Sequence, residues 1–94
     1  MVILIRHILS YLIEHPDAKD TTPGILRWWL PQGGLDRAEE EVQEALDTLV
    51  ARGWLTQRQT VTSQKLYGMN KEKLEEIKLF LRELERETAE QGGG

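Results

Sequence analysis

The stretch that decides the fold is DRAEEEVQEALDTLVARGWLTQRQTVTSQKLYGMN, from Asp36 to Asn70. Its first half has apolar residues at helical spacing, and Asp36 and Glu39 stand at capping-box spacing. Gly53 provides the left-handed residue that commonly closes a helix. We therefore expect an amphipathic helix over 36–52. Its buried stripe comprises Ala38, Val42, Ala45, Leu46, Leu49 and Val50.

Two short strands are expected after this helix. Residues 54–55 begin the first strand, a polar span follows from 56 to 64, and residues 65–69 return as the second strand. Within the polar span, the β-branched residues 60–62 favour extended backbone. The pattern therefore predicts a hairpin directly after the stop at Gly53.

Two helices are expected upstream of this stretch. Apolar residues at helical spacing indicate a helix over 2–14, and Pro16 ends it. Residues 17–20 are polar and fit a turn or a very short strand. Thr22 is expected to cap a short helix over 23–30, because proline is favoured at the first helical position.

A last helix is expected from about 71 to 90, with Asn70 as its cap. Residues 91–94, QGGG, are expected to form a disordered tail. No internal repeat or linker divides the chain of 94 residues. We therefore expect residues 1–90 to form a single domain.

In this order of elements the chain resembles the winged-helix family of DNA-binding domains, especially small bacterial transcriptional regulators. The residues that carry the resemblance are LDTLVARGWL at 46–55 and KLYGMN at 65–70. The resemblance covers about residues 2–90. It implies an α+β, mostly helical fold, in which a winged helix-turn-helix has a two-stranded wing and a C-terminal helix.

The resemblance also implies which residues meet double-stranded DNA. In that family the third helix lies in the major groove, and the wing touches the backbone or the minor groove. Carried over, the groove-facing positions are Arg37, Glu40, Gln43, Glu44 and Asp47. The wing contacts are Arg58, Gln59, Thr60, Thr62, Gln64 and Lys65, while Thr21, Thr22 and Arg27 stand near a phosphate at the entrance of the second helix.

The charge on the third helix departs from this family pattern. The formal net charge is -4, and the acidity lies on the third and fourth helices, whereas the hairpin is basic. Carboxylates close to phosphates oppose DNA binding, because affinity comes largely from phosphate neutralisation. Attraction to the positive helix N-terminus explains Glu39–Glu41 but not Asp47. Two functions stay open: a DNA-binding transcriptional regulator, which the element order favours, and a module that binds a protein partner and no DNA.

Adjacent tryptophans, Trp28 and Trp29, lie in the expected second helix. Neighbouring helical positions point about 100° apart, so both rings cannot share the centre of one face. Trp29 fits the core face, and Trp28 falls at its edge. We expect both rings to pack into the small core, and the alternative is an exposed Trp28 that anchors a partner.

The expected last helix carries an apolar seam. Its leucines and isoleucine follow the 3-4-3 spacing of a helical interface. The seam either covers the domain's own core or pairs with a second copy, and the size of the apolar face favours a homodimer. The expected interface residues are Leu74, Ile77, Phe80, Leu81 and Leu84.

Several function classes are excluded by composition. Hydrophobic residues at 39% and charged residues at 30% are typical of a soluble domain. The chain has no cysteine, and His7 and His15 have no partner at metal-ligand spacing. No segment approaches the ~20 apolar residues of a membrane span. Since no Gly-rich phosphate loop or nucleophile–base pair is visible, we expect a cytoplasmic protein with no metal, cofactor, membrane contact or enzymatic activity.

Overall fold

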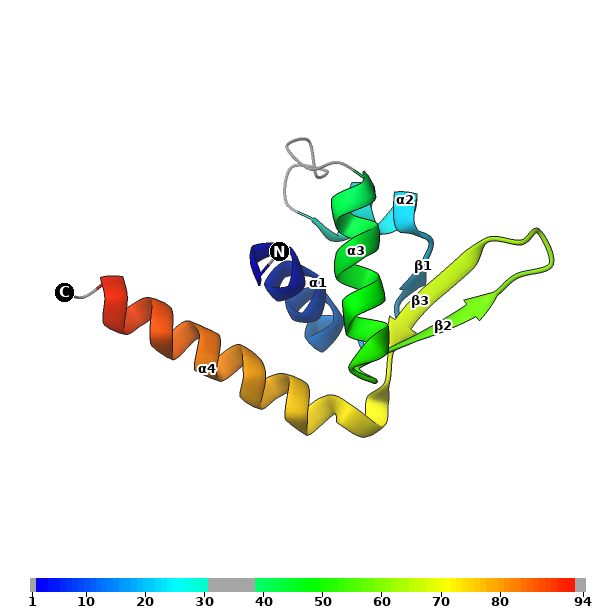
Figure 1. The fold of residues 1–94 in the computed structure, drawn as a ribbon. Coiled ribbons are helices and arrows are strands. Elements are labelled where there is room, and N and C mark those ends of the chain that lie inside the picture. Colours follow the sequence, from blue (N-terminus) through cyan, green and yellow to red (C-terminus); the bar gives the residue numbers. More distant parts are fainter. Residues whose placement is uncertain (1, 31–38, 93–94) are drawn as a thin grey trace.

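The computed structural model describes residues 2–30 and 39–92, without the side chains of 88–92 (Figure 1). Helical elements make up most of the chain, and three short strands lie among them. In order they are α1 (Val2–Glu14), β1 (Lys19–Asp20), α2 (Thr22–Gly24), the π-helical segment η1 (Ile25–Trp29), α3 (Glu39–Ala51), β2 (Leu55–Gln59), β3 (Lys65–Met69), the 3-10 turn η3 (Lys71–Lys73) and α4 (Leu74–Gly92).

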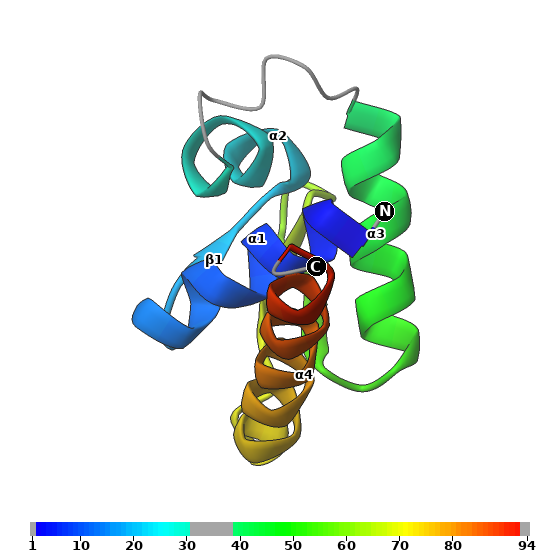
Figure 2. The same cartoon turned by 90° about the vertical axis from the view of Figure 1, so that its left-hand side faces the viewer.

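The core forms where α1 and α3 bury their apolar stripes. On α1 these are Leu4, Ile5, Ile8, Leu9 and Leu12, and on α3 they are Val42, Ala45, Leu46 and Leu49. Figure 2 shows α1 at the centre, where it contacts η1, α3 and α4. Val50 is only partly buried, and Ala38 lies outside the described residues, as do Asp36 and the expected helix start.

The three strands form one antiparallel sheet in the order β1-β3-β2. β2 and β3 make the expected hairpin, with Leu55 opposite Met69, and we call residues 55–69 the wing. β1 pairs with the other edge of β3, where Lys19 lies opposite Gly68. A Cβ atom on Gly68 would stand 3.1 Å from the Lys19 Cγ atom, so glycine permits this close pairing. The polar segment after α1 therefore contains the short strand.

The tip of the wing is a tight turn, and the expectation of extended backbone at 60–62 is wrong. Thr60 N donates to the Gln64 carbonyl at 2.7 Å, Ser63 N donates to the Thr60 carbonyl at 3.0 Å, and Ser63 has a φ of 67°. These bonds close the loop and outweigh the weak β propensity of the residues between them. Val61 is left fully exposed at the end of the wing.

The second helix differs from the expectation in its cap and its winding. Thr21, not Thr22, is the N-cap, and its hydroxyl accepts from Gly24 N at 3.3 Å. The helix then widens into π-helical turns over η1. Trp29 is buried and stacks on Tyr11 with ring centroids 5.0 Å apart, whereas Trp28 is 69% exposed. The expectation that both rings pack is therefore wrong, because neighbouring helical residues point in different directions.

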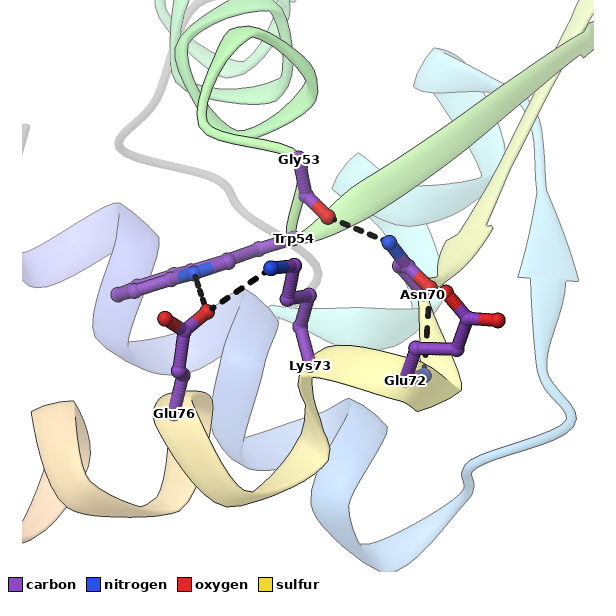
Figure 3. A network of polar contacts seen from close by, with 6 residues as sticks. All are labelled: Gly53, Trp54, Asn70, Glu72, Lys73 and Glu76. Atoms are coloured by element: carbon purple, nitrogen blue, oxygen red, sulfur yellow. Dashed lines mark hydrogen bonds and ion pairs between the residues drawn. The ribbon is translucent and has the colours of Figure 1, made fainter.

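A corner of hydrogen bonds joins the end of α3 to the start of α4 (Figure 3). Gly53 has a φ of 80°, which ends α3 as expected. Asn70 then acts twice: its Nδ2 donates to the Gly53 carbonyl at 2.7 Å, and its Oδ1 accepts from Glu72 N at 3.2 Å. Trp54 Nε1 donates to Glu76 Oε2 at 3.3 Å. The cap of the last helix is thus also a brace on the turn that leads into the wing.

Aromatic packing strengthens the same corner. Phe80 meets Trp54 edge to face, with ring centroids 5.0 Å apart. The Arg52 guanidinium lies 4.2 Å from the centroid of the Trp54 ring and 5.6 Å from that of Phe80. These contacts use the first half of α4 to cover the chain's own core.

The apolar seam of α4 is therefore not the free face that the dimer interface required. Ile77 is fully buried in the core, and Leu74, Phe80 and Leu81 pack partly buried against it. A monomer covers these side chains because Trp54 and α1 lie beneath them. The C-terminal half of α4 extends beyond the rest of the molecule (Figure 1) and runs to Gly92, which includes two residues expected in the tail.

One exposed ion pair ties the turn after α1 to η3. Lys71 donates a hydrogen bond to the Asp17 carboxylate, and this bond and the Lys71 charge hold the pKa of Asp17 below its usual range. The stabilisation is present above the unfolded pKa of the carboxyl and is lost as the pH falls through the lower folded pKa. Because both side chains are exposed, the contribution is small.

The burial of Ile77 makes a direct prediction for α4. Ile77→Ala should lower the free energy of unfolding by ~2–5 kcal/mol, because it opens a cavity in the core. Leu79→Ala is the matched control: Leu79 is 56% exposed on the same helix and should cost under ~1 kcal/mol. Urea denaturation followed by circular dichroism measures both. Equal losses at the two positions would mean that α4 is not seated as described.

The double role of Asn70 makes a second prediction. Asn70→Ala removes the cap and leaves the Gly53 carbonyl without its donor, so the loss should be ~1–3 kcal/mol. Asn70→Ser keeps a side-chain acceptor for Glu72 N and loses the amide donor without adding a charge, so it should cost less. Chemical denaturation of the two variants separates the roles, and an Asn70→Ala loss below about 0.5 kcal/mol would contradict the brace.

Candidate nucleic-acid interface

The start of α2, the first turns of α3 and the return strand of the wing surround a hollow of about 400 Å³. Thr21 and Glu39 stand on the helical side, Gln64 and Lys65 on the wing side, and Tyr67 is part of the lining. The hollow therefore brings together residues from all three regions that were expected to contact DNA.

A hydrogen-bond network around Gln43 lines this hollow. The Thr22 hydroxyl donates to Gln43 Oε1 at 2.7 Å. Gln43 Nε2 donates to the Tyr67 hydroxyl at 2.8 Å and to Asp47 Oδ1 at 2.9 Å. Thr22 and Tyr67 are both buried. The network joins α2, α3 and β3 through one amide.

Two of the expected DNA contacts are committed to this network. Thr22 is 7% exposed and its hydroxyl donates a hydrogen bond to Gln43, so it faces the interior. Gln43 was expected to face the groove, and both N–H donors of its amide are used inside the fold, while its oxygen accepts one hydrogen bond. The sequence could not show this, because the partner Tyr67 lies 24 residues away.

The remaining exposed face of α3 is acidic. Glu40, Glu44 and Asp47 are exposed there, and they flank the inward-turned Gln43. Arg37, the cation expected on this face, lies outside the described residues. Glu44 can accept from cytosine N4, but a face with several carboxylates repels phosphate.

The two expected wing cations point to opposite faces of the wing. Directly paired residues on antiparallel strands share a face, and Lys65 pairs with Gln59, whereas Arg58 pairs with Leu66. Lys65 faces the α3 side and borders the hollow. Arg58 lies on the outer side with Lys19 of β1, and both line a second depression of about 380 Å³. Lys19 was not among the expected contacts, since only the pairing of β1 with β3 places it there.

The other expected contacts lie where the wing and η1 leave them accessible. Gln59 and Gln64 are exposed, and so is Arg27 on η1. At the tip, the hydroxyls of Thr60 and Thr62 lie 2.9 Å apart and hydrogen bond to each other. Thr60 also accepts from Gln64 N at 3.3 Å, so it helps to shape the turn.

These elements define a winged-helix fold: a helix-turn-helix formed by α2 and α3, a two-stranded wing and flanking helices. The structure is similar to a crystal structure of MepR, a transcription regulator of the Staphylococcus aureus multidrug efflux pump MepA. The TM-score is 0.59 at 20% sequence identity, and the match covers 94% of this chain and 63% of that chain. Neither a protein-family model nor a curated protein sequence matches the chain.

Within residues 2–30 and 39–92, no helix is both long and apolar enough to cross a bilayer. The same ranges contain no group of three or more His, Asp or Glu side chains that could hold a metal ion.

Proposed function

We propose that this protein is a cytoplasmic DNA-binding regulator of transcription, a binding protein and not an enzyme, and that its wing leads the contact with double-stranded DNA. The observation that best supports this proposal is the positive charge of the wing. Residues 54–70 carry Arg58 and Lys65 and no carboxylate, in a chain whose net charge is -4. The similarity of the fold to that of MepR, a transcription regulator, supports the same function.

The wing carries cations on both of its faces, so both faces can contact DNA phosphates. Lys65 stands beside the hollow next to α3, while Arg58 and Lys19 stand on the outer face. Cations on both faces of a narrow hairpin can neutralise phosphates on two neighbouring strands of a groove. Each neutralised phosphate releases counterions and adds affinity, which the acidic face of α3 opposes. Binding to arbitrary sequences should therefore be weak.

The assembly that we propose is a homodimer formed through the exposed side of α4. Leu81 and Leu84 remain partly exposed there, and Leu79 is 56% exposed. A projecting helix gains most of its stability from packing, so a second copy is a suitable cover. Of the residues expected at the interface, Ile77 belongs to the core, and Leu74 and Phe80 pack largely against it.

A second function has its own observation. The exposed carboxylates Glu40, Glu44 and Asp47 form a negative surface that suits a basic protein partner. Trp28, 69% exposed on η1, is the type of side chain that anchors such interfaces. A winged helix that binds protein and no DNA is therefore the competing proposal, and one experiment below separates the two.

The wing prediction uses a matched pair of double variants. Arg58→Ala with Lys65→Ala should weaken binding to a random-sequence duplex and reduce the salt slope by about 1 per lost phosphate contact. Lys78→Ala with Arg82→Ala removes the same number of positive charges from α4 and should change the salt slope little. Fluorescence anisotropy over a salt series measures both. Identical slopes in the wild type and the wing variant would remove the wing from the interface.

The acidic-face prediction separates DNA from protein recognition. Glu40→Gln with Glu44→Gln should strengthen binding to the random duplex, because two repulsive charges leave the phosphates. Glu75→Gln with Glu85→Gln, which neutralises the same number of exposed charges on α4, controls for net charge. If only the global charge matters and the two pairs behave alike, α3 lies away from DNA and the protein-binding proposal takes precedence.

A further inference from the structure

Both N–H donors of the Gln43 amide are taken by partners inside the fold, and its oxygen already accepts one hydrogen bond. Its two N–H donors go to Tyr67 and Asp47, and its oxygen accepts from Thr22. Reading an adenine requires both the amide oxygen and the amide nitrogen of a glutamine at once. Reading a base in this way would require Gln43 Nε2 to release either Tyr67 or Asp47, so the hydrogen bonds of the amide favour a role inside the fold.

The position of Tyr67 shows what the network holds. β1 supports the wing only as far as the pairs Lys19↔Gly68 and Asp20↔Tyr67. Beyond Tyr67 the hairpin continues to its tip and projects from the body (Figure 1). The hydrogen bond from Gln43 therefore acts at the last residue of β3 that pairs with β1.

The other two bonds of Gln43 supply the fixed frame. Thr22 ties the amide to α2, and Asp47 lies one turn along α3 and holds the nitrogen from the same helix. The Gln43 amide thus makes one hydrogen bond to the wing and two to the helix-turn-helix. Together these bonds limit how far the hairpin can tilt against α3.

We propose that Gln43 is a positioning residue that sets the angle between the wing and α3, and that it does not contact a base. The role rests on the proposed DNA-binding function, since the angle places Lys65 and Arg58 relative to the groove that α3 faces. Rigid placement adds affinity because the ordering cost is met before binding.

The first test needs no DNA. The chain has no cysteine, so spin labels at Val61→Cys on the wing tip and Glu14→Cys at the end of α1 report one distance distribution. Tyr67→Phe, which removes a single oxygen, and Gln43→Met should broaden this distribution. Thr22→Val, which breaks only the α2 arm, should broaden it less, and Lys78→Met on α4 should leave it unchanged. Distributions that are the same in all variants would overturn the proposal.

The second test is a double-mutant cycle on a random-sequence duplex. Gln43→Met should weaken binding several-fold in the wild-type wing and have little further effect when Arg58 and Lys65 are already alanine. Equal weakening in both backgrounds would mean that Gln43 acts apart from the wing cations, and the proposal would be wrong. If the wild-type chain binds no duplex, the proposed function fails, while the label distances still decide whether Gln43 holds the wing.

Discussion

The burial of the α1 and α3 stripes against each other is the interaction on which the rest of the structure depends. Both stripes are fully or almost fully removed from water, and η1, β2 and α4 complete the same cluster. Burying one large aliphatic side chain is worth ~1.5–3 kcal/mol, so this contact is a large contribution against the entropy lost by the chain. Because one face of α3 is used in this way, the opposite face is presented to solvent with its acidic residues.

The corner after α3 connects this core to the wing and to α4. Gly53 ends the helix, Asn70 braces the turn, and Trp54 connects it to Glu76 and Phe80. The root of the wing and the start of α4 are therefore one packed unit. In the proposed function, the wing meets DNA and the exposed side of α4 meets a second copy. A shared rigid root would then fix the separation of two wings in a dimer, which is what a two-fold site requires.

Local signals were sufficient for the order of elements. The stop at Gly53, the cap at Asn70 and the apolar spacing of α1 and α3 are each read from a few neighbouring residues, and the structure has them. The site required contacts between distant residues. Gln43 has the spacing of a groove-facing residue, and only Tyr67 turns it inward. Ile77 has the spacing of a dimer seam, and only Trp54 and α1 show that it belongs to the core. The opposed faces of Arg58 and Lys65 follow from the strand register, which sequence spacing did not define.

The most direct measurement of the central claim is a titration of the ¹⁵N-labelled chain with a random-sequence duplex at low salt, followed by amide chemical shifts. If the wing leads the contact with DNA, fast-exchange shifts should concentrate on the wing and on the entrance of α2, with α4 largely unaffected. Shifts absent from the wing, or confined to Trp28 and its neighbours, would contradict a wing-led DNA-binding protein.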